Sequence, residues 1–144
     1  MNTRNLLLLV AASTLLAACA AKKGFEKPGF AFGCPIGGAS IGSMDDLIHA
    51  KVAKEGKRTT IEVTEIRCSM AGDLLEINAN LNNDSSRVKR VSYKFRWIDR
   101  KGMRAWEEET WKPLLMYENS NQTISAVAPT NTAADFRLLI LSQE

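Results

Sequence analysis

The sequence predicts an all-β fold, an immunoglobulin-like antiparallel β-sandwich of about seven strands, preceded by a signal peptide and a glycine-rich tether. Three observations lead to this prediction. Residues 91–97 alternate strictly between apolar and polar side chains, turn-forming residues separate several short β-rich runs, and an apolar N-terminal segment ends at a cysteine. We divide the chain into a signal peptide (1–18), a tether (19–43) and a sandwich domain (44–144). A small antiparallel barrel is the alternative fold.

The clearest strand lies within residues 87–103. In its middle, apolar and polar residues alternate: Val91, Tyr93, Phe95 and Trp97 lie between Arg90, Ser92, Lys94 and Arg96. A period of two is typical of a strand with one buried and one solvated face, so we expect the aromatic side chains to anchor the core. The basic side chains are expected on the solvated face, with an anionic partner such as envelope phosphate as the alternative. Asp99 and Gly102 predict a tight turn after this strand.

The N-terminus resembles a bacterial lipoprotein signal. Arg4 precedes an apolar stretch at residues 6–16, which is shorter than the roughly 20 residues that span a bilayer. The following Leu16-Ala17-Ala18-Cys19 is similar to a lipobox, which implies cleavage before Cys19 and its acylation. Several acyl chains, at about 0.8 kcal/mol per buried methylene, anchor a protein stably. In that class of proteins Ala20 favours the periplasmic face of the outer membrane over inner-membrane retention.

The predicted tether holds six of the nine glycines, between residues 20 and 42. Its composition indicates a spacer, although several aromatic residues suit contact with the sandwich. Cys34 lies in this segment and Cys68 in a predicted strand. Export to an oxidising compartment favours a disulfide between them, worth roughly 3–4 kcal/mol in the chain-entropy model. A buried free Cys68 with an incidental Cys34 is the alternative.

Residues 43–54 fit two structures. Met44, Leu47, Ile48 and Val52 have helical spacing, and Ser43 with Asp46 forms a weak capping box. Alternation around residues 48–52 favours a short edge strand, which is the interpretation we adopt. His49 is the single histidine of the sequence and is expected at the surface, since no recognisable set of metal ligands accompanies it.

The remaining strands follow from alternation and turn residues. Residues 60–70 predict a strand with a bulge near Glu65, and residues 75–81 predict its hairpin partner. After the central strand, residues 103–107 run back, and Pro113 confines a short strand at 111–116 to an edge. Further strands are expected at 122–128 and 136–141, the last one inside a sheet because both of its faces are apolar. Asp135 and Arg137 are candidates for a pair across the final turn, which would be worth about 0–1 kcal/mol if exposed.

Four sequence blocks carry a resemblance to a known family. They are Val91–Met103 (VSYKFRWIDRKGM), Trp111–Leu114 (WKPL), Ile124–Thr130 (ISAVAPT) and Ala133–Leu138 (AADFRL). In this order they resemble the YcfL-like family of periplasmic lipoproteins of unassigned function. The resemblance covers residues 60–141 and implies a β-sandwich lipoprotein. Some members are encoded beside a lipoprotein activator of penicillin-binding proteins, which implies a link to peptidoglycan synthesis. The glycine-rich segment with Cys34 departs from the family pattern.

We therefore expect a non-catalytic module anchored in the outer membrane, which binds an envelope protein in the periplasm. A net charge of +3 is too small to indicate a nucleic-acid-binding surface. No catalytic, cofactor or metal residues and no small-molecule substrate are inferred; Trp106, Trp111 and Tyr117 are the candidates for a partner surface. The alternatives are a secretion-system β-sandwich lipoprotein and a wall-active hydrolase. In a hydrolase, His49 would have to act as the general base, or the carboxylates of residues 107–109 as the catalytic acid and base.

Overall fold

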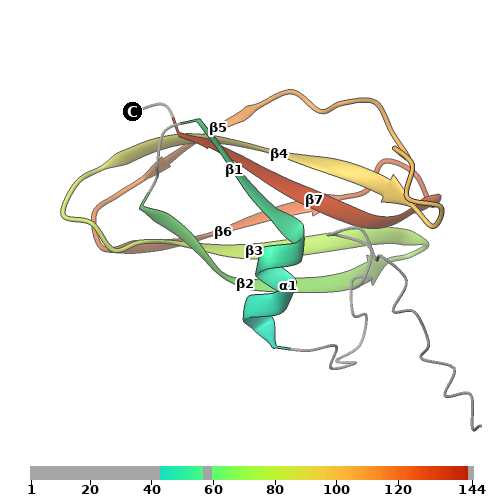
Figure 1. Ribbon diagram of the computed structural model, residues 1–144, viewed down its shortest axis with the longest axis horizontal. Coiled ribbons are helices and arrows are strands. Elements are labelled where there is room, and N and C mark those ends of the chain that lie inside the picture. Colours follow the sequence, from blue (N-terminus) through green and yellow to red (C-terminus); the bar gives the residue numbers. More distant parts are fainter. Residues whose placement is uncertain (1–42, 57–59, 143–144) are drawn as a thin grey trace, which may run out of the picture.

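The protein folds as a two-layer β-sandwich, which confirms the predicted fold class (Figure 1). The structure is a computed structural model that describes residues 43–56 and 60–142. One sheet has the order β1 (Val52–Gly56), β7 (Ala133–Ser142), β4 (Lys89–Asp99), β5 (Lys112–Met116). The other has the order β2 (Ile61–Ala71), β3 (Leu74–Asn83), β6 (Ser120–Val127). Strand β1 pairs with β7 in parallel, so the predicted purely antiparallel arrangement is wrong at this edge.

Strand β4 lies between β7 and β5, and Val91, Phe95 and Trp97 are buried as predicted, although Ser92, Lys94 and Ile98 are buried as well. The side chains of Phe95 and Trp97 are buried and their rings stack with centroids 5.7 Å apart. Phe136 of β7 packs against Phe95 at 6.0 Å. Stacked and tilted aromatic contacts stabilise a fold by more than the area they bury, so this cluster strengthens the packing between the two sheets.

Several finer predictions are also confirmed. The β2–β3 register shifts between Val63 and Glu65, where the apolar residues of the strand change from odd to even positions. Strand β7 has a neighbour on each side, as its two apolar faces require, and Pro113 lies in the edge strand β5. The apolar residues of both sheets meet in one core: Ile61, Val63, Ile66, Leu75, Ile77, Ala79, Leu81, Val91, Phe95, Trp97, Met116, Ile124, Phe136, Leu138 and Ile140.

The turn after β4 forms as predicted. Asp99 Oδ1 accepts the backbone N–H groups of Lys101 and Met103, both at 2.8 Å, and Gly102 has a φ of 82°. The returning chain pairs only at the isolated bridge between Ile98 and Arg104, so the expected run back over residues 103–107 is not a strand. The chain instead crosses above β4 and β7 to reach β5 (Figure 1).

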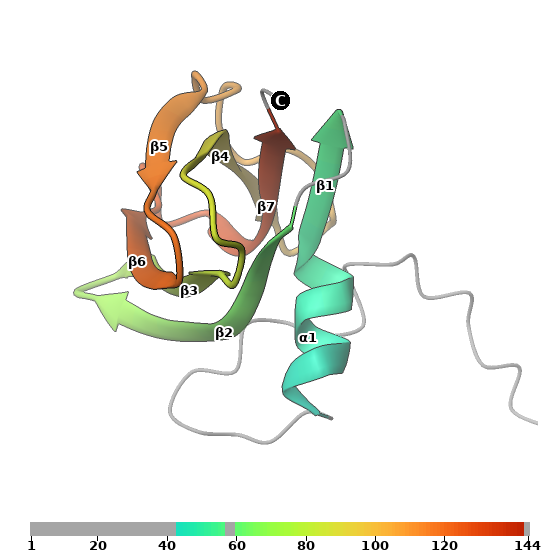
Figure 2. The ribbon, with the colours of Figure 1, turned by 90° about the vertical axis from the view of Figure 1, so that its left-hand side faces the viewer.

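The strand interpretation of residues 48–52 is wrong, because Met44–Lys51 forms the helix α1 and the strand β1 begins only at Val52. Both hydrogen bonds of the Ser43–Asp46 capping box are present. Leu47 is buried, and α1 packs beside the edge of β2 (Figure 2). The helix therefore forms because its first turn is capped and its apolar stripe is covered, which alternation over five residues did not reveal.

Candidate functional site

An apolar surface lies where β5 pairs with the start of β4. A groove of about 240 Å³ opens there. We call the following set the β5 surface: Val88, Arg90, Val91, Pro113, Leu114, Leu115 and Tyr117. Leu115 is 40% exposed, and Val88 and Tyr117 are 45% and 60% exposed at the adjoining ends of the two strands. Exposed large apolar side chains gathered beside a groove are typical of an interaction site.

The buried amide of Asn83 holds this end of the sandwich together. Its Nδ2 donates to the carbonyl oxygens of Arg87, Met116 and Tyr117 at 2.9, 3.3 and 2.7 Å. Its Oδ1 accepts the backbone N–H and the hydroxyl of Ser85 at 3.2 and 2.7 Å. One fully buried side chain thus joins the loop before β4 to the turn after β5, and both segments carry exposed residues of the β5 surface. No local sequence pattern indicates this role, because two of the three carbonyl oxygens belong to residues 33 and 34 positions along the chain.

The outer edge of β5 is poorly suited to pairing with another strand. Pro113 has no backbone N–H, and the carbonyl oxygen of Leu115 accepts a hydrogen bond from Gln122 Nε2 at 3.0 Å. Proline and occupied backbone groups are common ways in which edge strands avoid association. A partner at this edge would therefore meet the side chains of the β5 surface and not the backbone.

The connection formed by residues 100–111 covers part of the opposite end of β4. Lys94 Nζ contacts Glu108 Oε1 at 2.5 Å and lies 4.4 Å from the centroid of the Trp111 ring. Lys94 is 8% exposed and Ser92 is 4% exposed. The prediction of a solvated basic face is therefore wrong for Lys94, because the connection supplies a carboxylate and an aromatic ring above it.

A second carboxylate of the connection reaches into the sandwich. Glu109 Oε1 accepts the indole N–H of Trp97 at 2.7 Å, and its Oε2 contacts Lys112 Nζ at 3.2 Å. The buried indole thereby obtains the hydrogen-bond partner that such groups need. The run of glutamates at 107–109 thus provides two contacts that hold the connection in place.

Glu108 should make the stability of the protein depend on pH in acid. Its hydrogen bond to Lys94, together with the charge of that ammonium, holds the pKa of the Glu108 carboxyl below its usual range. A depressed folded-state pKa contributes stability above the unfolded-state value of about 4.3 and loses it as the pH falls through the folded-state pKa. Urea unfolding should therefore give wild type a larger free energy of unfolding than Glu108→Gln at neutral pH, and the difference should close as the pH falls below about 4.3 and through the folded-state pKa. Glu107→Gln is the control, and a Glu108→Gln difference that is constant with pH would contradict the assignment.

Comparison with known proteins places the chain in a family. The family model described as "Protein of unknown function (DUF1425)" matches residues 48–142. The chain belongs to the DUF1425 family. Its fold is similar to the crystal structure of Campylobacter jejuni cj0090, with a TM-score of 0.56 and 24% identity, covering 65% of this chain and 98% of the other. It is also similar to a DUF1425 family member from Shewanella sp. pv-4, with a TM-score of 0.52 and 23% identity, covering 56% of this chain and 75% of the other. No curated protein matches significantly.

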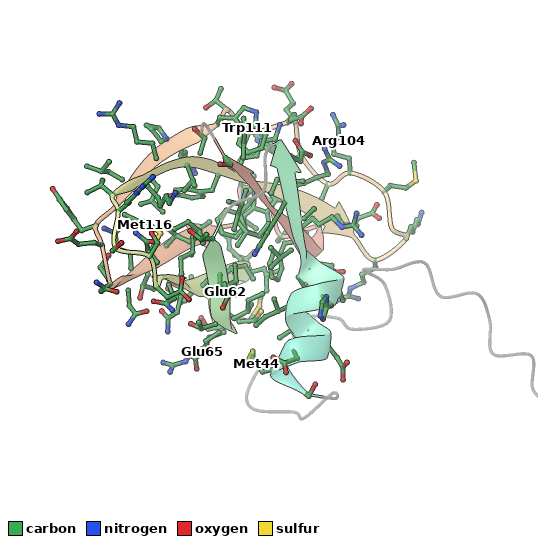
Figure 3. The ribbon with its side chains drawn as sticks, turned by 60° about the vertical axis from the view of Figure 1, so that its left-hand side comes forward. Met44, Glu62, Glu65, Arg104, Trp111 and Met116 are labelled. Atoms are coloured by element: carbon green, nitrogen blue, oxygen red, sulfur yellow. The ribbon has the colours of Figure 1, made fainter. Side chains whose placement is uncertain are left out.

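The three aromatic residues predicted as a partner surface do not all gather in this DUF1425 protein. Trp111 and Tyr117 adjoin opposite ends of β5, about 20 Å apart at 3.3 Å per residue. Figure 3 places Trp111 and Met116, which lie near these two ends, well apart. Trp111 is half-buried against Lys94, and Trp106 is 49% exposed on the connection. Tyr117 alone belongs to the β5 surface.

The predicted cysteine chemistry lies mostly outside the described residues of the DUF1425 protein. Cys68 lies in β2 and is disulfide-bonded. Its bonding partner is not among the described residues, so the pairing with Cys34 stays a prediction. Cys19 and the lipobox also lie outside the described part of the chain. Within that part, no helix is long and apolar enough to cross a membrane.

A mixed groove of about 450 Å³ lies between α1, β1 and β2 of the DUF1425 protein. His49, which is exposed as predicted, lines it together with Asp45, Lys54 and Glu62. In residues 43–56 and 60–142, no group of three or more His, Cys, Asp or Glu side chains is arranged to hold a metal ion. The groove therefore offers a polar rim beside the helix without a recognisable reactive centre.

An ion pair fastens α1 to β7. Lys51 Nζ lies 2.6 and 2.7 Å from the two carboxylate oxygens of Asp135, and the two side chains are 0% and 8% exposed. Burial raises the pKa of Asp135 and lowers the pKa of Lys51, while each charge opposes the shift of the other. The Asp135 carboxylate is thus buried and bound by a lysine 84 positions away, so the condition of an exposed Asp135–Arg137 pair is not met.

Proposed function

We propose that this DUF1425 protein is a non-catalytic, lipid-anchored module of the cell envelope that binds a protein partner through the β5 surface. The observation that carries the proposal is the group of exposed apolar side chains held in place by Asn83. A surface that is already ordered before binding loses less conformational entropy when a partner docks.

The composition of the β5 surface favours a protein as the ligand. Tyrosine and arginine, here Tyr117 and Arg90, are enriched at the centres of protein interfaces. The groove of about 240 Å³ is smaller than the 300–1,000 Å³ typical of small-molecule sites. It suits one apolar side chain of a partner, with the neighbouring surface extending the contact.

The N-terminal sequence supports a location in the envelope. The Leu16–Cys19 lipobox supports acylation of Cys19, and Ala20 supports attachment to the periplasmic face of the outer membrane. The partner is then a periplasmic or membrane protein within reach of the tether. The gene neighbourhood of YcfL-like relatives favours a partner that acts in peptidoglycan synthesis.

Site-specific cross-linking in intact cells tests this function. A photoreactive amino acid at Leu115 should capture one defined protein, and the same probe at Val127 should not. Val127 is a matched control because it is 45% exposed, against 40% for Leu115, and lies on the other sheet. Tyr117→Ala should weaken binding of the captured protein by about 2 kcal/mol, or roughly 30-fold in affinity, as expected for an aromatic anchor.

The control variants separate loss of binding from loss of folding. Leu115→Asp should abolish binding of the captured protein and leave the free energy of unfolding within about 0.5 kcal/mol of wild type, as for most exposed substitutions. Equal capture from positions 115 and 127, or undiminished binding by Leu115→Asp, would refute a partner site on the β5 surface. Digestion of purified wall by the protein would instead support the hydrolase alternative.

A further inference from the structure

Arg96 lies on the outer face of β4 with an incompletely used guanidinium group. Its Nη2 is 3.5 Å from Glu108 Oε1, longer than a strong charge-assisted hydrogen bond. Its Nε is buried and has no hydrogen-bond partner among the described residues. A buried donor without a protein acceptor is costly, and such groups in native structures call for an explanation, of which a bound ligand is one.

The surroundings of Arg96 carry an excess of positive charge. Arg137 of β7 is its direct cross-strand neighbour, an arrangement in which like charges repel. Lys94 lies two residues away on the same face of β4 and is almost fully buried. The Asp135 carboxylate binds Lys51 on both oxygens. Glu108 is the carboxylate that contacts both Lys94 and Arg96.

The position of Glu108 would allow another carboxylate to replace it at Lys94 and Arg96. One oxygen, Oε1, makes the contacts to both Lys94 and Arg96. Its side chain is 43% exposed and belongs to the irregular 100–111 connection, not to a strand. A carboxylate positioned side-on to Arg96 would use Nε and Nη2 together, the planar fork that matches two carboxylate oxygens.

We propose that Arg96 is the centre of a binding site for a peptide carboxylate, and that Glu108 is a resident ligand which the incoming carboxylate replaces. Arg96 supplies the fork, Lys94 supplies a second cation, and the Trp111 ring forms an aromatic wall beside Lys94. The site is separate from the β5 surface, since it lies toward the other end of β4. The carboxylate could end a wall peptide or a protein chain, because both present the same group.

Binding of short peptides to the full-length protein in detergent tests the site. The probes are N-acetyl-D-Ala-D-Ala, which represents wall peptides, N-acetyl-L-Ala-L-Ala, which represents protein termini, and the amide of each. Glu108→Gln removes the resident charge with little change of shape, so it should bind at least one acid with an affinity about tenfold or more above wild type. The Arg96 Nε–H and Trp111 indole resonances should shift in the same titration. The stronger of the two acids identifies the source of the ligand.

Two control variants make the result specific. Glu107→Gln, a neighbouring exposed carboxylate, should bind the acids as wild type does. The double variant Glu108→Gln/Arg96→Lys should bind the acids about tenfold or more weakly than Glu108→Gln alone, because lysine cannot present two parallel N–H groups. Equal binding of acid and amide by Glu108→Gln, or no binding of either acid up to about 10 mM with the fold intact, would overturn the proposal.

Discussion

Replacing Lys51 with methionine is expected to lower the free energy of unfolding by about 3–5 kcal/mol, because the Asp135 carboxylate stays buried after losing the cation bound to both of its oxygens. Urea denaturation at neutral pH measures the loss. Lys54→Met is the control, since Lys54 is an exposed residue of β1 and its substitution should change stability by about 0.5 kcal/mol or less. A Lys51→Met protein as stable as wild type would show that the pair is not needed for stability.

The loss in Lys51→Met should also depend on pH. Burial raises the pKa of Asp135, and removal of Lys51 takes away a charge that opposes this rise. A group whose folded-state pKa is raised contributes stability below its unfolded-state pKa and loses it as the pH increases through the folded-state value. The deficit should therefore be largest at neutral pH and should shrink as the pH falls toward about 4.

The double variant Lys51→Met/Asp135→Leu separates an unpaired charge from lost packing. Replacing a complete buried ion pair by apolar side chains of similar size is often neutral or stabilising. We therefore expect the double variant to recover most of the stability that Lys51→Met loses. A double variant as unstable as the single one would instead indicate that the shape of the lysine side chain matters more than its charge.

Asn83→Ala is expected to cost about 2–4 kcal/mol, because it removes the amide that donates to three carbonyl oxygens and accepts from Ser85. Hydrogen exchange gives a second measurement. The Asn119 amide, which donates to the Ser85 carbonyl at 3.2 Å, should exchange faster once the two segments separate. Asn82→Ala is the neighbouring control. Unchanged exchange at Asn119 would show that Asn83 does not hold this end of the sandwich.

The same substitution connects stability with the proposed function. If Asn83 keeps the β5 surface ordered before binding, Asn83→Ala should reduce capture by a probe at Leu115 although neither Leu115 nor Tyr117 has changed. The comparison is made at a temperature where the variant remains folded.

The strands were predictable because a buried sheet face imposes a period of two on the sequence. The apolar face of β4, the parity change at the β2 bulge, the two apolar faces of β7 and the edge position of Pro113 are all local signals. Each depends on residues within one strand, and each was confirmed.

The site residues were less predictable because their contacts join distant parts of the chain. Lys94 appeared solvated within its own strand, and only the return of residues 108–111 across the sheet buries it. Lys51 and Asp135 are 84 positions apart, so no sequence spacing indicates that they pair. The helix α1 was missed for a different reason, since eight residues with a short apolar stripe fit either a helix or a strand.

The parallel pairing of β1 with β7 determines how the domain responds to mechanical load. The pairs run from Val52–Leu138 to Gly56–Ser142, and α1 leads into β1 almost in line (Figure 2). A pull on the chain at Ser43 therefore acts along β1 and shears its hydrogen bonds together, whereas a pull across the strands would break them one after another. A sandwich held from its N-terminal side is thus loaded in the direction in which paired strands resist force most strongly.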